Sequence, residues 1–401
     1  MQFKNLQIIL TFVTCFALVL SSPINDNAVK ATIKQIDPTE KINIIDDKFK
    51  IVEYSGNDGV DALLKVGGFG NDLDLLNYVM NDIGYTNITN AFINNNGMAC
   101  TAFQTPNDKG DGYIFGRNFD WYEGHALILV NHPDNGYSSI STVNTDYINW
   151  FVYDLTFEEL VEKYFYNKEE LKSIPDDVLR VLSLYAPLDG LNEKGLSISV
   201  NMLPFDNGLN QNNTDFRHLT TLSTVRVLLD KVATVEEAVQ FLQETNIHAS
   251  LDVLIHYLIA DASGKSVSIE YINGEIVATE TKIITNFYVA EGMEKYGFGL
   301  ERYDIVEKKM AENPVMNVDD VRDTLKAASD DTLWSVAYDQ VNLEATYYMN
   351  KNYEEGYKIK LKVKSDDDSD DETLVNVDIP VEEDSADDSS DDSSDEETQE
   401  E

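Results

Sequence analysis

The sequence predicts an α+β fold in which two β-sheets lie between layers of helices. Segments with strand-like patterns come in groups, and pairs of helix-like segments separate the groups, which is typical of sheets covered by helices. The chain has 401 residues, of which 43% are hydrophobic and 10% aromatic. It is therefore long enough and apolar enough to bury a sizeable core.

Residues 1–22 are expected to be a secretory signal. A lysine precedes an apolar run over residues 8–20, and two serines follow that run, which is the layout of a cleaved signal peptide. A retained N-terminal anchor is the alternative. We therefore expect a secreted protein with no membrane association after signal removal, and Asn87 and Asn212 each begin an N-glycosylation tripeptide.

Residues 23–99 contain two segments with regular patterns. Residues 48–54 predict a strand, and the apolar spacing over residues 73–83 predicts a helix. The stretch 94–99, Asn-Asn-Asn-Gly-Met-Ala, is rich in turn formers. We expect a folded segment that ends in a flexible approach to Cys100.

Residues 100–121 predict a β-hairpin. Two short apolar segments flank the turn formers of residues 106–112. The hairpin would bring Arg117 and Asp120 beside Cys100, and a nearby cation lowers the pKa of a thiol, whose thiolate is the nucleophile. A surface hairpin with charged residues at its open end is the alternative.

The number of cysteines favours a reactive thiol. The chain has two cysteines, and Cys15 lies within the expected signal. Cys100 is then the only thiol of a secreted protein, in which cysteines usually come in pairs. An unpaired cysteine of this kind is either reactive or forms an intermolecular disulfide.

Regular patterns continue after the hairpin. Strands are predicted over residues 125–132 and 138–145, and an amphipathic helix over residues 157–171. After Gly195, apolar and polar residues alternate, so Asn201 is expected on the polar face of a strand.

Two pairs of helices are predicted in the second half. The first pair is 220–231 and 235–245, the latter with a capping box of Thr234 and Glu237. The second pair is 300–312 and 318–328, the latter capped by Asn317. Strands are predicted over residues 254–259, 266–272, 275–280, 282–290, 333–338 and 344–349.

The charge excludes some classes of partner. The formal net charge is −42, whereas nucleic acids and anionic membranes require a basic surface. Residues 365–401 hold nineteen acidic and no basic residues, which predicts a disordered, solubilising tail. Weak cation binding by this tail is the alternative, but the tail has no calcium-loop pattern. We predict that the protein uses no metal and no cofactor.

The chain resembles the choloylglycine hydrolase and penicillin V acylase family of linear amide C–N hydrolases, which are N-terminal-nucleophile enzymes. The similarity begins with Cys-Thr and with Gly-Arg-Asn-Phe-Asp-Trp at 116–121. It continues, in the order of the family, through further segments up to about residue 364. These segments are 189–196, 200–202, 256–271, 284–287, 300–303 and 334–338.

The resemblance implies a fold and a set of site residues. The fold would be the four-layer αββα sandwich. Cys100 would be the nucleophile, Asp120 would hold its α-ammonium, and Arg117 would stabilise the thiolate. Asn201 and Asn286 match the oxyanion positions, and Arg302 matches an arginine near the site. The alternatives are a surface ion pair for Arg117 and Asp120, strand-edge positions for the two asparagines, and an exposed helix arginine for Arg302.

The resemblance also implies a division of the chain. Residues 23–99 would be a prosegment that is removed by self-processing at the Ala99–Cys100 bond, and residues 100–364 would be the catalytic domain. An ordinary attached subdomain is the alternative for 23–99. The α-amine that cleavage frees has a reference pKa of about 8 and can take the proton of the thiol. No histidine is then needed, so we expect His256 to be structural and the other four histidines to lie on the surface.

The resemblance implies that the substrate would be a small-molecule amide, namely an acyl-amino acid, a bile salt conjugate or a penicillin V-like compound. The long leader is unusual for this branch and is more similar to that of acid ceramidase and N-acylethanolamine amidase. An acyltransferase of the same fold is a further alternative. From another class, an acidic secreted binding protein with an intermolecular disulfide at Cys100 is also compatible with the sequence, which leaves open whether copies associate as a homo-oligomer.

Overall fold

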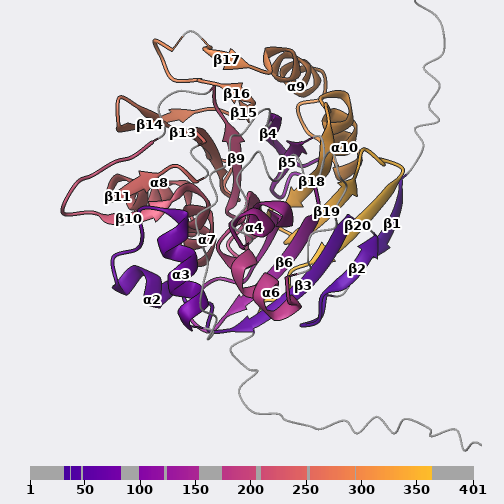
Figure 1. The fold of residues 1–401 in the computed structure, drawn as a ribbon. Coiled ribbons are helices and arrows are strands. Elements are labelled where there is room, and N and C mark those ends of the chain that lie inside the picture. The colour runs from indigo at the N-terminus through magenta and orange to yellow at the C-terminus, as the bar shows by residue number, and fades with distance from the viewer. Residues whose placement is uncertain are drawn as a thin grey trace, which may run out of the picture. The chain divides into compact units, whose positions relative to one another are not determined.

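The structure is a computed structural model that describes residues 31–36, 38–46, 48–82, 99–121, 124–152, 174–204, 209–250, 253–293 and 295–363. The described residues belong to one compact unit that ends at Val363. They form an α+β fold with two large sheets (Figure 1), which confirms the α+β part of the prediction. The predicted signal, the predicted helix over 157–171 and the predicted tail lie outside the described residues.

Among the described residues, seven strands form the first sheet, which contains the Cys100 hairpin. In spatial order they are β1 (Thr32–Gln35), β20 (Glu355–Lys360), β19 (Glu344–Met349), β18 (Thr332–Asp339), β5 (Tyr113–Asp120), β4 (Ala99–Pro106) and β15 (Ile283–Ile284).

The second sheet has nine strands within the described ranges. In spatial order they are β14 (Glu275–Glu280), β13 (Ser266–Ile272), β12 (Ile255–Ala260), β9 (Ser197–Met202), β8 (Asp189–Asn192), β7 (Ser139–Asn144), β6 (Ala126–Pro133), β3 (Phe49–Gly56) and β2 (Asn43–Asp46). Two small sheets pair β10 (Arg217–Thr220) with β11 (Thr245–His248), and β16 (Asn286–Phe287) with β17 (Gly297–Phe298).

The helices of the described residues lie between these strands along the chain. They are α2 (Val60–Lys65), α3 (Asp72–Asp82), α4 (Thr145–Val152), α6 (Asp176–Leu184), α7 (Thr221–Lys231), α8 (Val235–Gln243), α9 (Leu300–Glu312) and α10 (Val318–Ala327). None of them is long and apolar enough to cross a membrane.

Local chemistry explains where two predicted helices begin. Thr234 caps α8 by accepting a hydrogen bond from the backbone N–H of Glu237, and Asn317 forms a reciprocal capping box with Asp320 on α10. These contacts satisfy backbone N–H groups that have no partner inside the helix. Both predicted caps are confirmed, except that the Glu237 carboxylate accepts from Ala233 rather than from Thr234.

The core contains side chains from both large sheets. One hydrophobic cluster joins Cys100, Phe119 and Trp334 of the first sheet to Leu191 and Val200 of the second. The rings of Phe119 and Trp334 stack with their centroids 4.1 Å apart. The nucleophile expected from the sequence therefore lies where the two sheets meet.

A separate hydrophobic cluster lies beneath α9 and α10. Val306 of α9 and Leu325 of α10 pack in it with Phe103 and Ile114 of the Cys100 hairpin. These two helices therefore cover part of the first sheet, and α9 is held next to β4.

The segment before Cys100 supplies strands to both large sheets. β1 pairs in parallel with β20, although more than 300 residues separate them along the chain, and the two lie side by side in Figure 1. β3 lies between β2 and β6, and its residues Phe49, Ile51 and Val52 are fully buried. The strand and the helix predicted in this segment are confirmed, as β3 and α3.

The predicted strand over 282–290 is wrong as a single element. The structure has two short strands there, because Ile283 and Ile284 pair with β4 whereas Asn286 and Phe287 pair with β17. The break falls at Thr285 and turns the chain from one sheet to another. This turn places Asn286 next to β4.

Candidate active site

The hairpin around Cys100 forms as predicted. β4 and β5 pair antiparallel, with Cys100 opposite Phe119 and Ala102 opposite Arg117. Directly opposed residues have their side chains on the same face of a sheet, and alternate residues share that face. The side chains of Cys100 and Arg117 therefore share one face, whereas Asp120, opposite Ala99, lies on the other.

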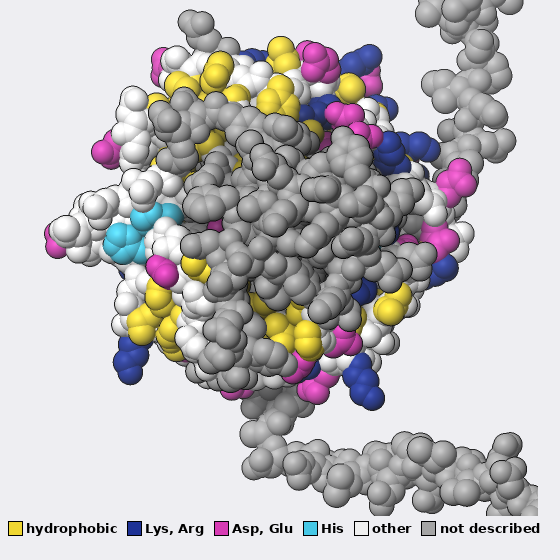
Figure 2. All heavy atoms as spheres, viewed as in Figure 1, with side chains coloured by type: hydrophobic (Ala, Val, Ile, Leu, Met, Phe, Trp, Pro, Cys, Tyr) yellow, Lys and Arg dark blue, Asp and Glu magenta, His cyan; other side chains and the backbone are white. Residues whose placement is uncertain are grey.

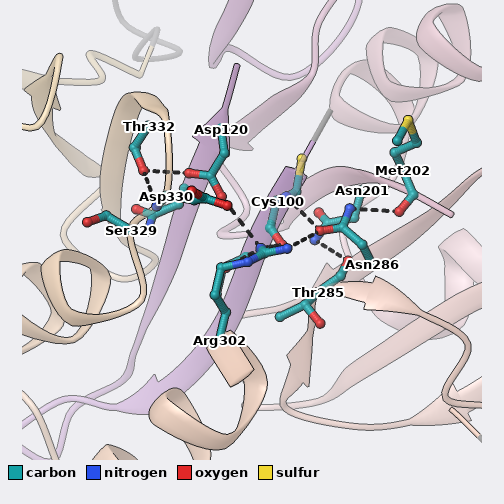
Figure 3. Close-up of polar contacts among 12 residues, drawn as sticks. Cys100, Asp120, Asn201, Met202, Thr285, Asn286, Arg302, Ser329, Asp330 and Thr332 are labelled. Carbon is teal, nitrogen blue, oxygen red and sulfur yellow. Dashed lines mark hydrogen bonds and ion pairs between the residues drawn. The ribbon is translucent and has the colours of Figure 1, made fainter. Parts of the chain in front are cut away.

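Two side chains hold the backbone of Cys100 (Figure 3). Its N–H donates to Asn286 Oδ1 at 2.8 Å, and its carbonyl oxygen accepts from Arg302 Nη1. Arg302 Nη2 donates to the same Asn286 oxygen at 2.6 Å. Cys100 is a free thiol with no exposed surface, so its backbone is fixed on both sides inside the protein.

Arg302 reaches this position from the first turn of α9. Gly299 precedes the helix with φ of +80°, and a Cβ there would lie 2.3 Å from Arg302 Nη2, so the close approach requires glycine. Arg302 also donates to Thr101 Oγ1 at 2.9 Å and lies 3.5 Å from Asp120 Oδ2. Since Arg302 is only 8% exposed, the alternative of an exposed helix arginine does not describe it.

Arg117 lies fully buried beside the thiol. Its Nε lies 3.3 Å from Asp189 Oδ2, and its Nη1 donates to Asn201 Oδ1 at 3.2 Å. Backbone carbonyls of Asn118 and Val200 accept from Nη1 and Nη2. Arg117 and Asp120 are both buried, so the alternative of a surface ion pair does not describe them.

The electrostatics of the thiol reflect two opposing effects. Burial raises the pKa of Cys100, and the positive charge of Arg117 acts in the opposite direction. The pKa of Asp120 is raised to about 6 by burial, against the lowering effects of Arg302 and of the Thr332 hydroxyl, which donates to Asp120 Oδ1 at 2.5 Å. Asp120 can therefore change its charge close to neutral pH.

The two asparagines lie next to the nucleophile, and each also bonds the backbone. Asn201 Nδ2 donates to the carbonyl of Thr285 at 3.0 Å, and Asn286 Nδ2 donates to that of Met202 at 2.7 Å. An amide nitrogen carries two hydrogens. One such bond therefore leaves a second hydrogen on each nitrogen, and the oxyanion role stays a prediction.

His256 is a structural residue of a strand, as predicted. It is buried on β12, where Nε2 contacts the carbonyl of Thr285 at 3.0 Å and Nδ1 contacts Glu270 Oε1 at 3.1 Å. These contacts support the chain just before Asn286. The prediction that the other histidines lie on the surface is wrong for His132 and His248, which are each 7% exposed.

Sequence reasoning missed two residues of the site, Thr332 and Asp189. Thr332 comes from the irregular start of β18, where the pairing with β5 shifts, and no sequence pattern marks it. Asp189 begins the segment 189–196, which was noted for its resemblance but given no role. Within the described residues, no three His, Cys, Asp or Glu side chains are grouped as metal ligands.

The arrangement suits acyl transfer. A buried thiol is a nucleophile when deprotonated, a guanidinium can stabilise the thiolate, and two carboxamides can donate to an oxyanion. Cys100, Arg117 and Asn201 lie at the junction of the two sheets, Asn286 and Arg302 hold the backbone of Cys100, and Asp120 pairs with Arg302 on the other face of the first sheet.

The match to a family profile agrees with this chemistry. The profile of the linear amide C–N hydrolases, choloylglycine hydrolase family, matches residues 100–330. Similar solved structures include a variant of the conjugated bile acid hydrolase from Clostridium perfringens, with 14% identity over 62% of this chain and 89% of that chain and a TM-score of 0.43. Another is the penicillin V acylase from Agrobacterium tumefaciens, with 16% identity over 62% of this chain and 83% of that chain and a TM-score of 0.40.

A search of curated proteins found no match. The family profile itself covers more than half of the chain and begins at Cys100, the residue around which the site is built. The protein is therefore a hydrolase of linear amide C–N bonds, and it belongs to the choloylglycine hydrolase family.

Proposed function

We propose that this protein is a secreted cysteine amidohydrolase that cleaves linear amides through a cysteinyl thioester, after self-processing at Ala99–Cys100. One observation carries the proposal. The thiol of Cys100 lies on the same face as Arg117, and the two polar backbone atoms of Cys100 are held by Asn286 and Arg302. The resemblance contributes the four-layer αββα arrangement and the role of a free N-terminal cysteine.

Self-processing begins in the intact chain, where the nitrogen of Cys100 is a peptide N–H. The sulfur attacks the carbonyl carbon of Ala99, and the C–N bond breaks as the nitrogen takes up the thiol proton. Water then hydrolyses the resulting thioester, which leaves a carboxylate on Ala99 and a free amine and thiol on Cys100. The Asn286 oxygen, 2.8 Å from the Cys100 nitrogen, is placed to hold the leaving amine.

Turnover uses the amine and the thiol of Cys100 together. The amine takes the thiol proton, and the sulfur attacks the carbonyl carbon of the substrate. The amide nitrogen leaves with the proton from the α-ammonium, and water hydrolyses the acyl thioester. The second hydrogens of Asn201 and Asn286 would stabilise the tetrahedral oxyanion.

The proposed substrates are small acyl amides. The similar structures are those of a conjugated bile acid hydrolase and a penicillin V acylase, so a bile salt conjugate, penicillin V and N-acyl amino acids make a first assay panel. Fatty N-acyl amides test the alternative that is similar to acid ceramidase. Added amines test for acyltransfer, because an acyltransferase would give a new amide in place of the free acid.

A binding protein joined through an intermolecular disulfide is less well supported. The Cys100 sulfur belongs to a residue with no exposed surface, so it cannot meet a second chain without a large rearrangement. Around the edge of the face shown in Figure 2, basic side chains lie among acidic ones. Secretion is supported by the signal pattern and by the exposed position of Asn212.

Blocking the amine is expected to abolish turnover while the thiol stays reactive. The experiment uses a chain that begins at residue 99, co-expressed with residues 23–98 as a separate chain, and mass spectrometry identifies the fraction that still carries Ala99, which is the fraction assayed. The matched control begins at Cys100 itself and is expressed in the same way. We expect activity in the control alone and iodoacetamide labelling of Cys100 in both, because the base is lost and the nucleophile is not. Equal activity in the two forms would refute the role of the amine.

Self-processing is expected to slow at acidic pH. The pKa of Asp120 is about 6, so its carboxylate and its pairing with Arg302 are lost as the pH falls through that value. The rate of processing should fall about tenfold between pH 7 and pH 5, measured by electrophoresis of purified precursor. Asp120→Asn should be slow throughout and should lack this pH dependence. If the processing rate of Asp120→Asn still fell between pH 7 and pH 5, the pH dependence would belong to another group.

A further inference from the structure

The segment 189–196 has no role in the mechanism proposed above, yet its first residue lies close to the nucleophile. Asp189 belongs to β8 of the nine-stranded sheet and is fully buried. The three side chains that it contacts, Arg117, Trp334 and Tyr338, belong to β5 and β18 of the seven-stranded sheet. Asp189 therefore connects the two sheets beneath the site.

The contacts of Asp189 suit a carboxylate. Oδ2 lies 3.3 Å from Arg117 Nε and 2.9 Å from Trp334 Nε1, and Oδ1 accepts from the Tyr338 hydroxyl at 2.7 Å. All three partners donate hydrogen bonds, and an ionised carboxylate accepts on both oxygens. The Tyr338 hydroxyl oxygen also lies 2.9 Å from the Tyr347 hydroxyl oxygen. This second contact helps to hold the Tyr338 hydroxyl in the position from which it donates to Asp189.

Arg117 interacts with two groups, the Cys100 thiol and the Asp189 carboxylate. On one side its charge favours the thiolate of Cys100, and on the other it pairs with Asp189. A buried charge without a partner is strongly unfavourable. Asp189 therefore both holds the guanidinium in place and offsets part of its charge.

We propose that Asp189 is a positioning residue for the nucleophile, which acts through Arg117 to set how much positive charge faces the Cys100 sulfur. The proposal rests on the proposed function only in taking Cys100 as the nucleophile. It assigns a chemical role to the first residue of the segment 189–196. It also explains why this residue reaches across to the other sheet.

Asp189→Asn tests this with little change in shape. The new amide oxygen can accept from Arg117 and Trp334, and the new NH₂ can donate to the Tyr338 oxygen, but the negative charge is gone. The charge of Arg117 then acts on the sulfur without offset. We expect the pH midpoint of iodoacetamide alkylation of Cys100 to fall by about one unit in the mature protein. An unchanged midpoint in a folded variant would overturn the proposal.

Tyr338→Phe is the matched control, because it removes one donor to Asp189 and leaves the charge. Its midpoint should stay close to that of the wild type, and a shift as large as that of Asp189→Asn would assign the effect to packing and overturn the proposal. Should Asp189→Asn fail to fold by circular dichroism, the double variant Arg117→Gln with Asp189→Asn should recover folding, since it removes both buried charges. Failure of this recovery would also count against the pairing.

The alkylation readout needs no substrate. A shifted midpoint in a protein that cleaves none of the amides tested would therefore support the role of Asp189 while the proposed function fails. If Asp189→Asn leaves the alkylation midpoint unshifted and the wild-type protein cleaves one of these amides, the proposed function stands and the role of Asp189 fails.

Discussion

Cys100→Ala is expected to remain a single uncleaved chain and to lose amidase activity by at least about 10⁴-fold. The methyl group of alanine cannot attack the Ala99 carbonyl, so neither the thioester nor the free N-terminus forms. The fold should persist, because Cys100 is a small residue in a large hydrophobic cluster and alanine keeps most of its packing. Electrophoresis and N-terminal sequencing of the purified protein measure the first effect, and an amidase assay measures the second.

Cys100→Ser is the matched control for this prediction. Its hydroxyl is a weaker nucleophile than a thiolate but sits in the same place, so we expect slow processing that gives a chain starting at residue 100. A wild-type protein with no chain starting there, or a Cys100→Ala variant that matures normally, would show that another protease makes the cut. The self-processing step would then have to be abandoned.

The two pieces formed by cleavage are expected to stay together until denaturant separates them. β3 pairs with β6 along its whole length, and its loss together with β2 would leave β6 as an unpaired edge of the nine-stranded sheet. Size-exclusion chromatography of the processed protein should give one peak that contains both pieces. Separate elution in native buffer would contradict this.

The magnitudes support that expectation. Among the described residues before Cys100, five apolar side chains are fully buried, namely those of Phe49, Ile51, Val52, Val60 and Leu63. At about 2 kcal/mol each, their burial contributes about 10 kcal/mol, which is comparable to the net stability of a whole domain at about 5–15 kcal/mol. Polar contacts add to it, such as that of Lys231 Nζ with Asp61 Oδ1 at 2.8 Å. A chain that lacks residues 31–82 is therefore expected to be insoluble.

A pair of substitutions tests the same interface without deletion. Ile51→Ala on β3 removes a fully buried side chain and should lower the free energy of unfolding by about 2–5 kcal/mol. Ile44→Ala on β2 removes a side chain that is 69% exposed, and it should change that free energy by less than about 0.5 kcal/mol. Equal effects in urea titrations would mean that β3 does not belong to the cooperative unit.

Local chemistry determined several features that the sequence alone predicts correctly. Turn formers between two apolar segments make the hairpin that carries Cys100, because they allow the chain to reverse within a few residues. Thr234 and Asn317 begin helices because their side chains bond backbone N–H groups only three residues away. The number and positions of the two cysteines also identified Cys100 as the unpaired thiol of the expected mature chain.

Only the tertiary structure decided which distant segments meet. Nothing in the local pattern of Thr32–Gln35 specifies a parallel pairing with Glu355–Lys360, and nothing near Asp189 specifies Arg117 as its partner. The break at Thr285 follows from pairing with two different strands, whereas the local sequence, with apolar residues on both sides of Thr285 and Asn286, also fits a single strand. The hydrophobic periodicity of a helix or strand indicates which of its faces is buried. The element that packs against that face is determined by the packing of the whole chain, because many distant segments could pair with it.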